Sequence, residues 1–303
     1  MTMGTTIIHI SDIHYRQDWP ENHGIVLKAF FSDLEKIIQK FTANTFYIII
    51  SGDIVQAGEN KKAYENFLLT CGPAFDKMGI PKSRRICLPG NHDISRSRLT
   101  SSLTDHEGIV SQELQETSLN DYFQECNPVF HEKFCCYKEF ESNFSDMPVL
   151  ADSVGGRGYQ LNDDVGLYCL NTALLSSGGL SKPDKNPLHD KKRLGVITRD
   201  LNLWLNSTNT PCKILATHHP LNWLPSWADR EIRTLLRKYF SLFLSGHAHD
   251  QEAYHSININ NPLVELSAPP LFTQKTDTLG YALINIPSGQ NYVSEVIYRQ
   301  WTK

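Results

Sequence analysis

The sequence predicts an α/β fold organised around a mainly parallel β-sheet. Short runs rich in Ile, Leu and Val alternate with longer segments of helical periodicity, a pattern typical of parallel strands joined by helices. Several of these apolar runs end at Gly, Asp, Asn or His, as expected for loops that leave the carboxyl ends of parallel strands. The composition, 40% hydrophobic and 10% aromatic over 303 residues, is that of a globular protein with a full core.

The N-terminal part of the chain is predicted to alternate strand, helix, strand, helix, strand. Three short apolar runs have the length and composition of buried strands, at residues 5–10, 46–50 and 85–88. The segments between them place apolar residues at helical spacing, at 26–41 and 61–78. Gly52 and Gly90 follow the second and third runs, where a loop that turns tightly beside other backbone requires glycine.

The middle of the chain departs from this alternation. Residues 95–152 form long polar and aromatic stretches with helical spacing, including 109–125 and 128–144. We interpret this segment as an inserted helical cap. Residues 178–193 are rich in Gly, Lys, Pro and Asp and are predicted to form a surface loop that shapes access to a site.

The C-terminal half returns to alternating strands and helices and ends in antiparallel strands. Helices are predicted at 196–205 and 228–239. Strands are predicted at 159–161, 166–171, 213–217 and 242–244. The tail adds antiparallel strands at 251–254, 263–266, 281–286 and 292–298. No repeat or linker divides the chain, so residues 1–303 are predicted to form one domain with one insertion.

Charge and cysteine content narrow the range of partners and compartments. Lys and Arg total 29 against 33 Asp and Glu, a formal charge of −4, so nucleic acid is a possible partner that the charge does not support. No apolar run approaches the roughly 20 residues that span a membrane, and the first residues lack the pattern of a secretory signal. The seven cysteines are an odd number without a CxxC pair, as expected for reduced thiols in the cytoplasm.

Five short blocks rich in Asp, Asn and His each follow an apolar run. Their side chains offer the oxygen and nitrogen donors that suit borderline divalent cations, and their density exceeds ordinary usage. Together they predict a site for two metal ions. The blocks are Asp12-Ile13-His14, Gly52-Asp53, Gly90-Asn91-His92-Asp93, His218-His219 and Gly246-His247-Ala248-His249.

The spacing within three of these blocks suits metal ligation. Asp12 and His14 are two residues apart and share one face of an extended chain, so both can reach one cation. His247 and His249 repeat this spacing with two imidazoles. Asp53 has two carboxylate oxygens and can bridge two cations about 3.5–4 Å apart. Taken alone, the first two blocks also fit ordinary turns, and only their combination favours a metal site.

The third block adds a ligand and a group that transfers protons. Two-metal sites are typical of enzymes that cleave phosphate esters. Asn91 is a neutral oxygen ligand, which limits the negative charge in a site that accepts an anionic phosphate. His92 is expected to face the substrate and protonate the leaving oxygen, while Asp93 hydrogen-bonds its other nitrogen and holds the tautomer.

Several neighbouring residues are candidates for contacts with the substrate. Adjacent residues of an extended chain point in opposite directions, so His218 is the predicted ligand and His219 lines the substrate pocket or is simply a buried, hydrogen-bonded histidine. Arg96 offers a guanidinium group to a second phosphate or forms a surface salt bridge. Trp223 and Trp227 either stack on a nucleobase or fill the core.

The five blocks, in this order, resemble the motifs D-x-H, G-D, G-N-H-[DE], H and G-H-x-H of the calcineurin-like metallophosphoesterase superfamily. The resemblance spans residues 7–250. It implies a four-layer αββα sandwich of two mixed β-sheets flanked by helices, in which the antiparallel tail completes the second sheet. It also implies the ligands of each metal. One metal is held by Asp12, His14, Asp53 and His249, and the other by Asp53, Asn91, His218 and His247.

The expected reaction is in-line attack at phosphorus by a hydroxide that bridges two divalent metal ions. Imidazole-rich ligands favour Mn, Fe or Zn over Mg. The expected contacts with the substrate are made by Asn91, His92, Arg96 and His219.

The first and third blocks resemble the class III cyclic-nucleotide phosphodiesterases and also a nuclease branch of the superfamily. We rank a nucleotide or another small-molecule diester first, because the chain lacks a basic surplus. The alternatives are a DNA or RNA nuclease, and a regulatory or effector module that needs a partner domain. The second alternative follows from the resemblance of residues 89–96 and 218–224 to bacterial phosphoesterase modules fused to other domains.

Overall fold

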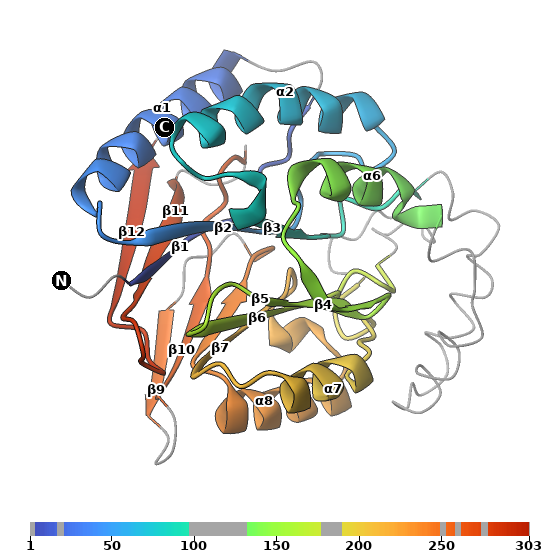
Figure 1. Ribbon diagram of the computed structural model, residues 1–303. Coiled ribbons are helices and arrows are strands. Elements are labelled where there is room, and N and C mark those ends of the chain that lie inside the picture. Colours follow the sequence, from blue (N-terminus) through green and yellow to red (C-terminus); the bar gives the residue numbers. More distant parts are fainter. Residues whose placement is uncertain are drawn as a thin grey trace.

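Two β-sheets pack face to face in the computed structural model, and helices cover the outer side of each sheet (Figure 1). Both sheets contain parallel and antiparallel pairs, so the predicted four-layer αββα sandwich is confirmed. The structure describes residues 4–16, 21–96, 132–176, 190–248, 253–257, 262–273 and 278–302.

The first sheet has the strand order β12-β11-β1-β2-β3. Its parallel strands lie where the apolar runs predict them, at β1 (Thr5–Ile10), β2 (Thr45–Ser51) and β3 (Arg85–Leu88). The antiparallel strands β11 (Thr278–Ile286) and β12 (Glu295–Thr302) lie beside β1. Residues of β1 to β3 are almost all buried, as expected for strands covered on both faces.

Helices α1 (Glu21–Lys40) and α2 (Lys61–Lys77) cover the outer face of the first sheet. The apolar stripe of α1 is buried at Leu27, Phe30 and Leu34, which lie three and four residues apart. The side chain of Asn60 accepts a hydrogen bond from the Ala63 N–H at 3.0 Å and caps the start of α2. The predicted helices at 26–41 and 61–78 are therefore confirmed. A short 3₁₀ helix, η1 (Lys82–Arg84), leads into β3.

The second sheet has the order β4-β5-β6-β7-β8-β10-β9. Its first three strands are β4 (Val149–Ser153), β5 (Gly156–Gln160) and β6 (Val165–Leu170). The others are β7 (Cys212–Ala216), β8 (Leu242–Ser245), β9 (Ala253–Ile257) and β10 (Pro262–Ser267). The 3₁₀ helix η3 (Leu221–Trp223) follows the loop after β7. Helices α7 (Arg199–Ser207) and α8 (Ser226–Tyr239) cover the outer face.

Two expectations about strands were wrong. The tail does not all join the second sheet, because only β9 and β10 extend it and β11 pairs with β1 of the first sheet. β11 is buried along nearly its whole length, which suits a strand inside a sheet. β4 was placed within the predicted helical cap. It is an edge strand with Val149 and Leu150 exposed, so no alternation of buried residues marked it.

The predicted insertion lies mostly outside the described residues. Residues 97–131, including the expected helix at 109–125, are among those not described, as are 178–189 of the predicted surface loop. The end of the insertion forms α6 (Cys135–Phe144), which packs against α2 and buries Tyr137, Phe140 and Phe144. The cap itself stays a prediction.

Three apolar layers hold the elements together. One lies between the sheets, and the others lie beneath the helices of each outer face. The described cysteines are all free, and Cys126 lies outside the described residues. None of the helices in the described parts of the chain is long and apolar enough to cross a membrane.

Candidate metal centre

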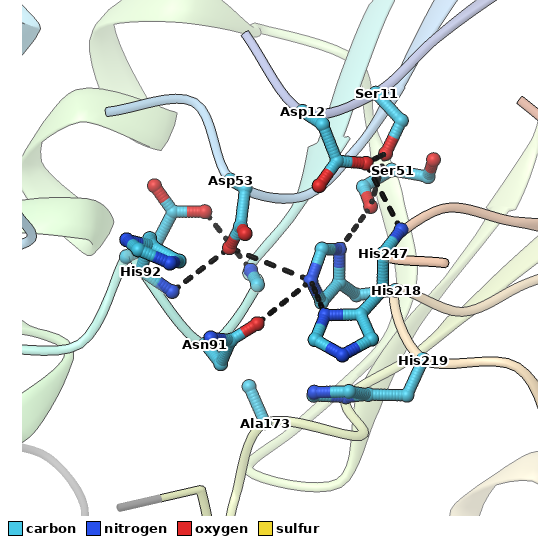
Figure 2. A network of polar contacts seen from close by, with 12 residues as sticks. Ser11, Asp12, Ser51, Asp53, Asn91, His92, Ala173, His218, His219 and His247 are labelled. Atoms are coloured by element: carbon cyan, nitrogen blue, oxygen red, sulfur yellow. Dashed lines mark hydrogen bonds and ion pairs between the residues drawn. The ribbon is translucent and has the colours of Figure 1, made fainter. Parts of the chain in front are cut away.

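The five chemical blocks meet along one edge of the sandwich, because each follows the carboxyl end of a strand (Figure 2). The first three blocks follow β1, β2 and β3 of the first sheet, and the other two follow β7 and β8 of the second sheet. The fully buried His218 joins the two halves. Its Nδ1–H donates to the backbone oxygen of Ser51 at 2.8 Å, and its Nε2 lies 3.0 Å from Oδ1 of Asn91.

The potential ligand atoms form three overlapping groups, each with its atoms within 4.8 Å of one another. Asp53 belongs to two of the groups, as expected for a residue that bridges two cations. His218 also belongs to two. The groups are His14, Asp53 and His92; Asp12, Asp53 and His218; and His218, His219 and His247. The predicted ligands that the structure describes are thus brought together, whereas His249 lies outside the described residues.

Strained backbone marks the same residues. Among the described residues other than glycine, positive φ angles occur at Asp12 (52°), His14 (47°), Asp53 (54°), His247 (67°) and Lys192 (65°). A non-glycine residue held in this region costs about 1–3 kcal/mol and persists only where the surrounding structure enforces it. Four of the five are predicted ligands. The strain therefore indicates that the fold aims these side chains at one another.

Two glycines allow the loops to approach. Gly52 has a φ of 96°, and a Cβ atom there would lie closer than 3.0 Å to the His218 ring. A Cβ atom at Gly90 would lie equally close to the carboxylate of Asp53. Any side chain at either position would push a predicted ligand away. Both glycines therefore allow the close approach of loop backbone that the sequence predicts.

Asp12 connects the first loop with the fifth. Its Oδ2 accepts hydrogen bonds from the Ser11 hydroxyl at 2.6 Å and from the backbone N–H of His247 at 2.9 Å. The other oxygen, Oδ1, lies 3.6 Å from Nε2 of His14. Asp12 thus keeps one oxygen toward His14 while the other fixes the fifth loop.

Asp93 is buried beneath the second and third loops. Its carboxylate accepts hydrogen bonds from the backbone N–H groups of Ile54 (3.1 Å), Val55 (3.3 Å) and Gly90 (2.9 Å). The Tyr64 hydroxyl donates to it at 2.9 Å. Asp93 therefore positions the two loops that carry Asp53 and Asn91, and no short sequence pattern signalled Tyr64 as its partner.

The predicted hydrogen bond from Asp93 to His92 is wrong. Nδ1–H of His92 donates to the backbone oxygen of Gln56 at 2.8 Å, which fixes the tautomer and leaves Nε2 unprotonated. Asp93 is fully buried and accepts the backbone N–H groups of Ile54 and Gly90. His92 instead lies beside Asp53 (Figure 2). Burial lowers the pKa of His92, against the opposing charge of Asp53, so the ring is neutral near pH 7. Arg96 lies close enough for its charge to lower this pKa further.

His219 lies against the centre, and one of its ring nitrogens belongs to the group formed with His218 and His247. The Thr172 hydroxyl accepts the backbone N–H of His219 at 3.1 Å and lies 3.0 Å from Nδ1 of its ring. The tautomer decides which of these two groups donates, and therefore whether the ring hydrogen is on Nδ1 or on Nε2. Nε2 is buried without a hydrogen-bond partner, beside the ring of His247. Thr172 follows the carboxyl end of β6, so the rule that located the five blocks could have found it.

These residues fit a centre for divalent metal ions. The Nδ1–H of His218 is used by Ser51, so Nε2, which lies 3.4 Å from Oδ1 of Asp53, is the nitrogen that can bind a cation once it has lost its proton. Imidazole nitrogens, carboxylate oxygens and one amide oxygen form a donor set that suits Mn, Fe or Zn. Like charges and unpaired ring nitrogens at this density are costly unless cations compensate them.

Metal uptake is expected to depend on pH. Burial lowers the pKa of His218, but the charges of Asp53 and Asp12 outweigh burial and raise it to about 9. In the metal-free protein His218 is therefore protonated at neutral pH, and a cation must displace that proton. Affinity for Mn²⁺ is expected to rise roughly tenfold per pH unit between about pH 6 and 9. Calorimetry in buffers of different ionisation enthalpy checks this, and an affinity that is constant over this range would contradict it.

Comparison with known proteins agrees with this geometry. Two mixed sheets with His, Asp and Asn donors along a shared edge are an arrangement that can hold divalent metal ions. The model of the calcineurin-like phosphoesterase family matches residues 5–251, and the chain belongs to this family. The His and Asp groups along this edge are compatible with the two divalent metals that members of this family typically bind.

Individual relatives are distant. An uncharacterized metallophosphoesterase-like protein of Bacillus subtilis strain 168, YydB, is 24% identical over 314 residues, covering 99% of this chain and 62% of the relative. Purple acid phosphatase PPD1 from yellow lupin seeds (Lupinus luteus) has 11% identity and a TM-score of 0.51, covering 98% of this chain and 54% of that chain, and this likeness shows the fold. A phosphatase from Mycoplasma pneumoniae has 11% identity and a TM-score of 0.48, covering 100% and 95%. The chain thus spans about three fifths of the length of YydB.

Proposed function

We propose that the protein hydrolyses a phosphodiester, either a nucleotide or another small-molecule ester, at this centre. The observation that supports a diester is that the two rings facing the substrate are both neutral. Burial lowers the pKa of His92, and burial together with His247 and His218 holds the pKa of His219 well below its usual value. Neutral rings suit a diester, which carries one negative charge, better than a monoester, whose second pKa is near 6.

The proposed roles follow from the position of each side chain. Asp12, His14, Asp53, Asn91, His218, His247 and His249 would hold two divalent cations. Such cations lower the pKa of a water molecule and neutralise the charge that builds on the phosphoryl oxygens.

Figure 2 shows His92 and His219 on different sides of Asp53 and His218. In the tautomer with its hydrogen on Nε2, His219 would donate to an oxygen of the phosphoryl group, and Asn91 would help to orient it. The anionic substrate would raise the pKa of His92, whose Nδ1 is held by Gln56, so that Nε2 gains a proton for the leaving oxygen. Arg96, beyond His92, would contact the leaving arm.

A second candidate function is a phosphoesterase module that acts with a partner domain. It is favoured by the length of YydB, of which this chain covers 62%. A DNA or RNA nuclease ranks below both, because the formal charge of −4 provides no overall attraction for a polyanion.

The proposal is tested by comparing an aryl diester with its monoester. The Mn-loaded protein is expected to hydrolyse bis(p-nitrophenyl) phosphate with a kcat/KM at least about tenfold above that for p-nitrophenyl phosphate, because one negative charge matches the neutral rings of His92 and His219. Release of p-nitrophenol measures both reactions. A preference for the monoester would refute the diester assignment, and absence of turnover on both would favour the module that needs a partner.

Replacement of His92 by Ala is the control for its role in this assay. The variant keeps the ligands assigned above, so metal content measured by elemental analysis is expected to stay near that of the wild type. The rate of diester hydrolysis is expected to fall roughly 10²- to 10⁴-fold, the usual contribution of a proton donor. Equal loss of metal and activity would instead make His92 a ligand, as its grouping with His14 and Asp53 allows.

A further inference from the structure

A basic turn lies next to the metal centre and takes no part in the reaction described above. It consists of Lys191, Lys192 and Arg193 and precedes α7 in the chain. The turn is held by backbone hydrogen bonds, from Lys192 N–H to the Trp223 oxygen at 2.6 Å and from Arg193 N–H to the Asp190 oxygen at 3.0 Å. Three consecutive cationic residues are thus fixed to the segment that follows His218 and His219.

Trp223 connects this turn to the metal centre. Its ring meets the ring of His247 edge to face, with centroids 4.1 Å apart and an interplanar angle of 83°. The ring of His219 lies 5.9 Å from the same indole. The ammonium group of Lys191 lies over the Trp223 ring, 5.8 Å from its centroid. The charge of Lys191 is therefore one aromatic ring away from the His219 side of the centre.

The backbone of the turn is strained in the same way as the metal ligands. Lys192 has a φ of 65°, and it is the described non-glycine residue with a positive φ that lies outside the predicted ligand set. The side chain of Lys192 is exposed and does not offset the strain of this backbone conformation. Strain of this kind is typically retained where it positions a functional group. Here it orients the turn so that Lys191 lies against Trp223.

The charges of Lys191 and Lys192 are available to a ligand. Lys191 and Lys192 are exposed, and no carboxylate of the described residues forms a salt bridge with either ammonium group. The contact with Trp223 holds Lys191 near the centre only weakly, since a cation gains little over a ring that is partly open to solvent. An anion that replaced this contact would gain a charge-assisted hydrogen bond, which is stronger.

We propose that Lys191, presented by Trp223 and the strained turn, binds a second anionic group on the substrate. This inference rests on the proposed diesterase function and specifies its substrate class, a diester whose retained arm carries a further phosphate or carboxylate. The arm extends from the phosphoryl group past His219 and His247 toward Trp223. The other arm leaves on the side of His92. The two sides of the centre therefore distinguish the retained arm from the leaving arm.

Binding of a matched pair of nucleotides tests the proposal. Thymidine 3′,5′-bisphosphate and thymidine 5′-monophosphate differ by one phosphate, and their affinities for the Mn-loaded protein are measured by calorimetry. The bisphosphate is expected to bind the wild type about tenfold more tightly, and Lys191→Gln to abolish this difference while the affinity for the monophosphate stays within about twofold. A carboxylate in place of the 3′-phosphate is expected to retain part of the difference.

Lys238→Gln is the matched control. Lys238 also lies over an aromatic ring, 4.8 Å from the centroid of Tyr239, but it precedes β8 and so lies at the opposite end of the sheet from the metal centre. This variant is expected to bind both nucleotides like the wild type. Equal affinities of the wild type for the two nucleotides, no binding of either, or a parallel loss in Lys191→Gln would overturn the proposal.

The same variants separate this proposal from the proposed reaction. A wild type that hydrolyses bis(p-nitrophenyl) phosphate without preferring the bisphosphate ligand would keep the diesterase function and remove the second anion site. A wild type that prefers the bisphosphate through Lys191 but hydrolyses no diester would keep the anion site and remove the function.

Discussion

Replacement of Asp53 by Asn is expected to lower phosphoesterase activity at least about a thousandfold, equivalent to about 4 kcal/mol of transition-state stabilisation. Oδ1 of Asp53 accepts the backbone N–H of His92 at 2.8 Å and lies 3.4 Å from Nε2 of His218, while Oδ2 lies 3.9 Å from Nε2 of His14. An amide keeps one oxygen and loses the negative charge, so it cannot serve both sides of the centre. The measurements are kcat/KM and metal content by elemental analysis.

The control for this prediction is a carboxylate of the same kind away from the centre. Asp152 on β4 is exposed and pairs with Arg157 at 2.8 Å, so Asp152→Asn is expected to keep full activity and full metal content. Asp53→Asn is nearly isosteric, and its far-ultraviolet spectrum should match that of the wild type. A variant that retained two metals and a rate within tenfold of the wild type would remove Asp53 from the bridging role.

Replacement of Asp93 by Ala is expected to lower the free energy of unfolding by about 3–5 kcal/mol, a typical loss when one member of a buried charged network is removed. Four donors would lose their acceptor, namely the N–H groups of Ile54, Val55 and Gly90 and the hydroxyl of Tyr64. The change is measured by urea denaturation of the metal-free protein. The loss of activity should then follow from displaced loops and be accompanied by loss of metal.

Tyr64→Phe is a milder test of the same hydrogen-bond network as Asp93→Ala. It removes one of the four donors and keeps the ring, so a loss of about 1 kcal/mol is expected. The idea that Asp93 pairs with His92 makes the opposite prediction. In that case Asp93→Ala would leave the unfolding curve unchanged and shift the pH dependence of kcat.

Most of the metal centre could be located from the sequence, because each group of predicted ligands directly follows an apolar run. The strands β1, β2, β3, β7 and β8 are buried on both faces, so their residues are continuous apolar runs, and the loop after each begins where the run stops. Since parallel strands align their carboxyl ends, finding the runs was nearly equivalent to finding the ligands.

Partners and directions were harder to predict. The run at 281–286 showed that β11 is a strand, but its position beside β1 depends on which edge is open in the folded protein. Asp93 and His92 are adjacent in sequence and separate in space, because side-chain direction in a loop depends on the local backbone. The acceptor that holds His92 is a backbone oxygen, which every residue has and no motif marks.

The hydrogen bond from His218 to Ser51 places the metal centre on the seam between the two halves of the sandwich. The loops of the first sheet carry Asp12, His14, Asp53 and Asn91, whereas those of the second carry His218 and His247. Neither half alone holds a complete set of ligands. Metal ions that bind here would contact loops of both sheets. They would stabilise the docked arrangement of the sheets by RT ln(1 + [L]/Kd), where [L] is the concentration of free metal. A chain with misaligned sheets would have no catalytic centre, so correct assembly and the ability to react are one event in this architecture.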